Sequence, residues 1–124
     1  MREIPNVRQH PGESRRRWFV DDYFELIVWF DRADRIVLFE LSYDLERDWR
    51  AIRWNAALGC SHFRVDDGED RPHRNAAPLL RVIVEAPPAE MLEAFEAHSQ
   101  TLDPDIAATV TARLLEYRAA RTRI

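Results

Sequence analysis

The spacing of apolar residues changes at Pro87 and Pro88, and this change constrains the fold more than any other feature of the chain. Before the two prolines, apolar residues recur at every second position, the period of β-strands that bury one side. After them, apolar residues recur at helical spacing, and Pro88 suits the first turn of a helix. Strands first and helices last predict an α+β domain, with helices packed on one face of an antiparallel sheet.

Two C-terminal helices are predicted from this spacing. The first follows Pro88, and the second begins at Asp103-Pro104, because aspartate is a common helix cap and proline a common first helical residue. Their apolar stripes are Met91, Leu92 and Phe95 in the first, and Ile106, Val110, Leu114 and Tyr117 in the second. We expect both stripes to form the core of the domain and not a groove for a partner.

An antiparallel sheet of about four to five strands is predicted before the helices. The two clearest runs of β-forming residues flank a short polar segment and predict a hairpin. The expected strands cover residues 23–30, 36–43, 49–54, 60–66 and 79–86, with a further short strand at 17–20. We expect residues 15–124 to form a single α+β domain, with residues 1–14 as a loosely ordered N-terminal arm.

The register of the hairpin follows from the charges on its two strands. A loop of two residues would place Glu25 directly opposite Glu40, and directly opposed like charges are unfavourable. A loop of four residues, 32–35, keeps the same faces and places Glu25 opposite Ser42 and Glu40 opposite Ile27. We therefore predict the longer loop.

The composition is that of a soluble protein of one domain. The chain has 124 residues, of which 46% are hydrophobic and 32% charged, and its formal net charge is −4. A negative net charge argues against a nucleic-acid partner, which favours a basic surface. The longest apolar run, 26–30, is too short to span a bilayer, so we expect no membrane partner. A single cysteine, Cys60, fits a reducing cytoplasm, where we place the protein.

The polar segment 60–74 is one candidate for a site, because polar chemistry at the end of a strand is where sites are commonly built. His62 and Asp66 would be about 13 Å apart on a strand and could hardly share one metal ion. His73 would have to fold back to join either of them, with Glu69 adding an oxygen. A solvated turn explains the same residues, since Asp-Gly is a common turn dipeptide. We therefore assign no metal site, and catalytic residues and cofactors stay unknown.

The second face of the predicted sheet is the other candidate, because it mixes charged and large apolar residues. If the strands pair in sequence order, it carries Glu25, Ile27, Trp29, Ile36, Leu38, Glu40, Arg53 or Arg50, His62, Arg64, Arg81 and Glu85. Paired carboxylates beside histidine and arginine suit acid–base chemistry or a small anionic ligand, whereas a charge ladder facing water is the simpler alternative. An apolar patch of this kind is rarely left wet, so we expect the N-terminal arm, a ligand or a second subunit to cover it.

Three segments of the chain carry a resemblance, and they read FELSYD (39–44), AIRW (51–54) and HFRVDDGE (62–69). They resemble a family of small bacterial proteins of unknown function, over roughly residues 22–115. The resemblance implies a small bacterial cytosolic protein. It brings no reaction or ligand with it, so every candidate residue depends on the patterns above.

These patterns predict a non-enzymatic binding or interaction domain that forms a homodimer. The candidate binding residues are Glu25, Trp29, Glu40, His62, Arg64, Asp66, Glu69 and His73. The alternative is a small metal-assisted hydrolase that combines the His62/His73 acidic loop with the Glu25/Glu40 pair, using a bound ion to activate water.

Overall fold

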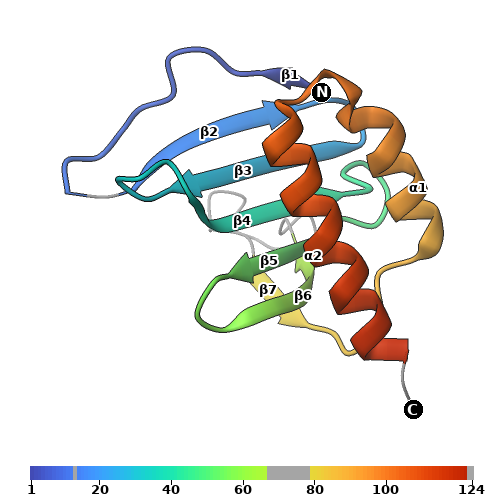
Figure 1. The fold of residues 1–124 in the computed structure, drawn as a ribbon. Coiled ribbons are helices and arrows are strands. Elements are labelled where there is room, and N and C mark those ends of the chain that lie inside the picture. Colours follow the sequence, from blue (N-terminus) through green and yellow to red (C-terminus); the bar gives the residue numbers. More distant parts are fainter. Residues whose placement is uncertain (13, 67–78, 123–124) are drawn as a thin grey trace.

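The computed structural model describes residues 1–12, 14–66 and 79–122, which form one antiparallel sheet of seven strands with two helices on one side (Figure 1). Each strand pairs with the next one along the chain, so the order across the sheet is the order in the sequence. The strands are β1 (Arg2–Glu3), β2 (Arg15–Val20), β3 (Phe24–Phe30), β4 (Ile36–Tyr43), β5 (Arg50–Asn55), β6 (Gly59–Asp66) and β7 (Leu79–Val82). The helices are α1 (Ala89–His98) and α2 (Pro104–Thr122), joined by the short 3₁₀ helix η1 (Ser99–Thr101).

The predicted α+β class with two C-terminal helices is confirmed, but the sheet has seven strands and not four to five. One additional strand is β1, which lies within the segment predicted as an arm and pairs with β2. Both of its residues are charged and exposed, so no alternation of apolar residues marks it in the sequence. The last strand, β7, ends at Val82 and not at residue 86, because the chain then leaves the sheet for α1.

The hairpin of β3 and β4 has the predicted register. Glu25 lies opposite Ser42, and Ile27 lies opposite Glu40, so the two glutamates do not face each other directly. The pairing shifts by one residue after Trp29, at a bulge close to the turn. The charge argument therefore predicted the register of Glu25 and Glu40 correctly, and the bulge changes the pairing only at the end of the hairpin.

The helices bury the predicted stripes against one side of the sheet, which we call the covered face, except that Leu92 is only partly buried. In Figure 1 both helices lie on the same side, and α2 crosses the strands. Phe24 of β3 packs edge-on against Phe95 of α1, with ring centroids 5.6 Å apart. Asp103 caps α2 as predicted, because its carboxylate accepts a hydrogen bond of 3.0 Å from the backbone N–H of Asp105. The core is Phe19, Phe24, Leu26, Val28, Phe30, Phe39, Leu41, Tyr43, Ile52, Trp54, Met91, Phe95, Leu102, Ile106, Val110 and Leu114.

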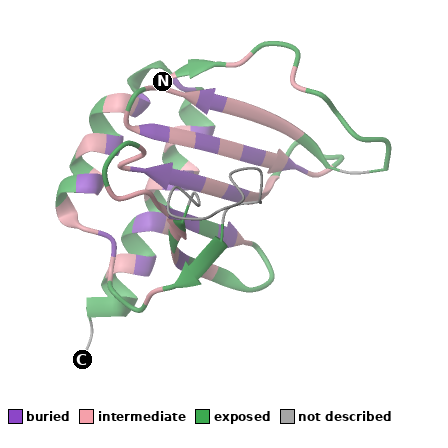
Figure 2. Ribbon diagram, turned by 180° about the vertical axis from the view of Figure 1, so that it is seen from behind, coloured by how far each residue is buried: buried purple, intermediate pink, exposed green. Residues whose placement is uncertain are grey.

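The opposite side of the sheet carries no helix, and we call it the open face. The strand pairings place on it Trp18, Val20, Glu25, Ile27, Trp29, Leu38, Glu40, Ser42, Ala51, Arg53, Ser61, Phe63, Val65, Leu80 and Val82. Figure 2 views the sheet from this side, and buried and partly exposed positions alternate along β3. No helix in the described ranges is long and apolar enough to cross a membrane.

Candidate functional site

The sheet divides the predicted site residues between its two faces. Glu25, Trp29 and Glu40 lie on the open face, whereas His62 and Arg64 lie on the covered face. The prediction that one mixed face carries all of these residues, together with Arg81, is therefore wrong. Asp66 shares the covered side of β6 with His62 and Arg64, while Glu69 and His73 lie outside the described residues.

The error arises on β6, where the apolar residues do not mark the covered side. Phe63 and Val65 suggest a core face, yet Phe63 pairs with Ala51 on the open face. His62 pairs with Ile52 of the core, and its side chain is buried. Because both faces of this sheet carry apolar residues, alternation alone does not tell which face the helices cover.

His62 is buried in the covered face and both of its ring nitrogens are occupied. Nδ1 lies 2.8 Å from the carbonyl oxygen of Glu85 and Nε2 lies 2.6 Å from the hydroxyl of Tyr43. A carbonyl only accepts, so Nδ1 carries the proton and Tyr43 donates to Nε2. Burial lowers the pKa of His62 and raises the pKa of Tyr43. His62 is thus a neutral residue that joins β4, β6 and the segment leading to α1, with no nitrogen free for a metal.

Cys60, the other candidate on the covered face, is also poorly suited to catalysis. Burial raises the pKa of the Cys60 thiol to about 11, so very little reactive thiolate is present at neutral pH. Within the described residues, no three histidine, cysteine, aspartate or glutamate side chains are arranged to hold a metal ion. His62 and Cys60 therefore serve the fold.

On the open face, Glu25 has an unusual environment for a carboxyl group. It is partly buried, and within residues 1–12, 14–66 and 79–122 its side chain makes no hydrogen bond or ion pair. Burial raises the pKa of Glu25, and the negative charge of Glu40, diagonally across the hairpin, raises it further. The neighbours of Glu25 in the ladder are Val20 and Ser42, neither of which carries a compensating charge. The open face therefore offers an unpaired acceptor.

Glu40, in contrast, has a partner on the neighbouring strand. Arg53 lies directly opposite on β5, and its Nη2 and Nε donate to the same oxygen of Glu40, Oε2, at 2.7 and 3.2 Å. This ion pair neutralises one of the two carboxylates and leaves Glu25 as the uncompensated one. The two glutamates are therefore not equivalent, although the sequence presents them as a pair.

Large apolar side chains surround these charges. Five large apolar residues from β2, β3, β4 and β6 are partly exposed on the open face: Trp18, Ile27, Trp29, Leu38 and Phe63. The indole Nε1 of Trp18 is shielded from solvent, and no described residue accepts a hydrogen bond from it. An apolar surface with an unpaired carboxyl group and an unpaired N–H donor suits the binding of another molecule better than contact with water.

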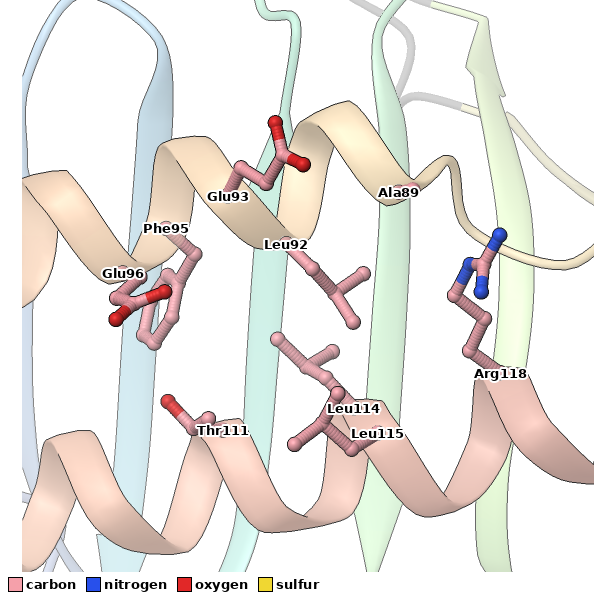
Figure 3. Close-up of a pocket in the computed structure, with 9 residues that line it drawn as sticks. All are labelled: Ala89, Leu92, Glu93, Phe95, Glu96, Thr111, Leu114, Leu115 and Arg118. Atoms are coloured by element: carbon pink, nitrogen blue, oxygen red, sulfur yellow. The ribbon is translucent and has the colours of Figure 1, made fainter.

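A separate groove lies on the outer side of the helices, and the sequence analysis did not predict it. It has a volume of about 270 Å³ and is lined by residues of α1 and α2. Figure 3 shows Leu92 of α1 pointing toward Leu114 and Leu115 of α2, with Glu93 and Arg118 toward the rim. Leu115 falls outside the core stripe of α2 and is 54% exposed, which is the sequence signal that could have indicated this groove. It contains no histidine or cysteine, and none of the predicted site residues.

No family model, curated protein or solved structure matches this chain. The function therefore has to be argued from the geometry of the two faces.

Proposed function

We propose that this protein is a non-enzymatic interaction module, located in the cytoplasm, that forms a homodimer through the open face of its sheet. The observation that carries the proposal is the environment of Glu25, a partly buried carboxyl group that has no partner among the described residues and shares its face with the partly exposed Trp18 and Trp29. A second subunit would remove the apolar surface from water and could supply a charge for Glu25.

The size of the open face is compatible with this proposal. Seven strands that are about 4.8 Å apart and on average about 20 Å long give a surface on the order of 600 Å². A stable interface of standard size takes about 800 Å² from each partner. The face thus provides most of the area that a dimer needs, and its rim can supply the remainder.

A two-fold dimer also offers a partner for the unpaired carboxyl group. In such a dimer the same surface occurs on both sides of the interface, so each subunit presents Arg53 to the other. The side chain of Arg53 is 47% exposed while it pairs with Glu40, which leaves donors available for a second carboxylate. Glu25 of the partner subunit is the carboxylate that lacks a positively charged partner among the described residues.

The alternative, a metal-assisted hydrolase, has less support. It requires His62 to act with the Glu25/Glu40 pair, and these groups lie on opposite faces of the sheet. The burial of His62 between Tyr43 and Glu85 also leaves its nitrogens occupied. The interaction module is therefore the better proposal.

The test is the mass of the protein in solution, measured by native mass spectrometry and by light scattering across a range of concentrations. We expect a dimer for the unchanged chain and a monomer for Trp29→Asp, because the aspartate would be buried without a partner in the interface. Leu58→Asp is the matched control, since Leu58 is 87% exposed in the turn before β6 and lies off the open face. A monomeric parent protein, or a folded Trp29→Asp that keeps its dimer mass, would refute the proposal.

A further inference from the structure

The strand β7 forms one edge of the described sheet, and three of its four residues are exposed apolar side chains. Leu79, Leu80 and Val82 are 55%, 46% and 68% exposed, and Val84 just beyond the strand is 72% exposed. Sheet edges are normally blunted by charges, prolines or very short strands. The opposite edge follows that rule, because β1 has only two residues and both are charged. The exposed apolar edge of β7 is therefore suited to pairing with another strand.

The backbone of β7 has hydrogen-bonding groups available for another strand. Beyond the strand, the N–H of Ile83 donates to the carbonyl oxygen of His62 on β6, at 3.0 Å. Backbone groups alternate in direction along an antiparallel strand, so Arg81 also directs its groups toward β6. Leu80 and Val82 then direct their N–H and C=O groups away from β6, toward the edge.

A row of arginines on the covered side of the sheet ends at this edge. Arg50 lies opposite Arg64, and Arg64 lies opposite Arg81, so three like charges occupy adjacent positions on β5, β6 and β7. Directly opposed like charges are unfavourable unless a counter-charge compensates them. Asp48 supplies that charge for the first two, at 3.6 Å from Arg50 Nε and 2.6 Å from Arg64 Nη1.

Arg81, the last arginine of the row, has no such compensation. Among the described residues its side chain forms no ion pair and no hydrogen bond. Asp66, which lies diagonally across on β6, has an interaction of its own and forms no ion pair with Arg81 in the described part of the chain. The next position in the row lies beyond the edge of the sheet, where a further strand would place a side chain.

We propose that β7 binds an extended acidic segment of another protein, which adds to the sheet as a further strand. Such a segment would place a carboxylate beside Arg81 on the covered side and apolar side chains beside Leu80 and Val82 on the open side. The alternation of acidic and apolar residues is thus specified by the faces of β7 itself. The proposal does not depend on the dimer, since it rests on the backbone edge of β7 and on Arg81 of the covered side, although Leu80 and Val82 also lie at the rim of the open face.

A second copy of this chain fits the edge less well than an acidic segment does. In a two-fold pairing of β7 with itself, the two strands would bring their Arg81 side chains to the same side of the joined sheets. The only charged residue of the strand is this arginine, so the pairing would extend a row of positive charges without adding a negative one. Charge complementarity therefore favours a partner that carries aspartate or glutamate.

Binding is measured by fluorescence anisotropy with two labelled peptides of about six residues, the usual length of a strand. One peptide alternates valine with glutamate and the other alternates valine with lysine. We expect the unchanged protein to bind the glutamate peptide and to discriminate against the lysine peptide by at least about tenfold in Kd, with weaker binding at high salt. Equal affinity for the two peptides, or no binding of the glutamate peptide, would overturn the proposal.

Two variants separate the charge from the strand pairing. Arg81→Glu should weaken the binding of the glutamate peptide by about tenfold or more in Kd. Arg2→Glu makes the same charge change at the opposite edge and should leave the binding of this peptide unchanged. Val82→Pro removes an N–H that points away from β6, so the pairing with β6 survives while the added strand loses a hydrogen bond. We expect this variant to keep its melting temperature and to lose peptide binding.

The variants also show which molecule occupies the edge. Unchanged peptide binding by a folded Val82→Pro would mean that the glutamates contact only side chains, and the added strand would be ruled out. If Val82→Pro converts a dimer to a monomer while Val82→Ala, which shortens the same open-face side chain but keeps the N–H, stays dimeric, the edge is occupied by a second copy of the chain and the proposal of an acidic partner fails. If Trp29→Asp is monomeric and still binds the glutamate peptide, the edge and the open face act independently, as proposed.

Discussion

Both faces of the sheet carry large apolar residues, but they differ in whether their polar groups have hydrogen-bond partners. On the covered face, the hydroxyl of Tyr43 and both nitrogens of His62 have hydrogen-bond partners, and both residues are buried. On the open face, the partly buried carboxyl group of Glu25 has no partner among the described residues, and neither has the indole N–H of Trp18. Buried polar groups that are satisfied within one chain, such as those of Tyr43 and His62, serve the fold, whereas unpaired polar groups on a partly exposed face indicate contact with another molecule.

The largest expected difference between the faces is in side-chain packing, and two leucines of β4 test it directly. Leu41 is fully buried on the covered face, whereas Leu38 is partly exposed on the open face. We expect Leu41→Ala to lower the free energy of unfolding by about 2 to 5 kcal/mol, because it removes buried atoms and leaves a cavity. Leu38→Ala should cost less than about 1 kcal/mol in the monomer, since its side chain already contacts water.

The measurement is urea unfolding of both variants at protein concentrations low enough to keep the chain monomeric, because Trp29 lies directly opposite Leu38 and its substitution would change the surroundings of this side chain. The two variants make the same chemical change on the same strand, so they differ only in the face. Equal losses would mean that the open face is packed as tightly as the core, and the distinction between the faces would fail.

The sequence predicted the structure well where a charge or a cap constrained it locally, in the hairpin and at the start of α2. The unfavourable opposition of Glu25 and Glu40 gave the correct hairpin register, and Asp103 marked the start of α2. Both predictions depend on contacts between residues that are close in the chain, which a local pattern can report. The helix stripes were predicted for the same reason.

The sequence could not show which side of β6 faces the helices. Phe63 and His62 alternate on that strand, and ordinary hydrophobicity assigns Phe63 to the core. The choice is made by distant partners, because Tyr43 and the carbonyl of Glu85 satisfy the buried imidazole. The arginine row could not be predicted for the same reason. Only the pairing of three strands brings Arg50, Arg64 and Arg81 together.

The second prediction concerns the buried imidazole of the covered face. His62→Phe keeps a ring of similar size but leaves the Tyr43 hydroxyl and the Glu85 carbonyl without their hydrogen bonds. We expect the free energy of unfolding at pH 7.5 to fall by about 2 to 4 kcal/mol, because buried polar groups without partners carry their full desolvation cost. Tyr43→Phe, which unpairs only one nitrogen of His62, should cost less.

The effect of His62 should also depend on pH in a defined direction. Burial lowers the pKa of His62 in the folded protein, so below about pH 6.5 the unfolded chain takes up a proton that the folded protein does not. The stability contributed by neutral His62 is complete above that pH and is lost as the pH falls through the lowered pKa. The difference between the parent protein and His62→Phe should therefore narrow between pH 7 and pH 5, and a difference that widens would contradict a neutral buried histidine.

The smallest expected effect is on the open face, where we expect a substitution to raise the free energy of unfolding instead of lowering it. Burial and the charge of Glu40 raise the pKa of Glu25, so the ionised carboxylate destabilises the folded monomer at neutral pH. We expect Glu25→Gln in the Trp29→Asp background to raise the free energy of unfolding by a few tenths of a kcal/mol at pH 7. The gain should disappear below about pH 4, where the parent carboxyl group is protonated in both the folded and the unfolded states.

Glu40→Gln is the matched control for this prediction, because it removes a carboxylate that already has a partner. The change relieves some repulsion of Glu25 but breaks the ion pair with Arg53, so we expect no comparable gain in stability. In the dimer-forming parent background, Glu25→Gln should instead weaken association if Arg53 of the second subunit contacts Glu25. If Glu25 destabilises the monomer but strengthens the dimer, it has a role in binding. If Glu25 destabilises both the monomer and the dimer, the proposed interface does not explain its unpaired carboxylate.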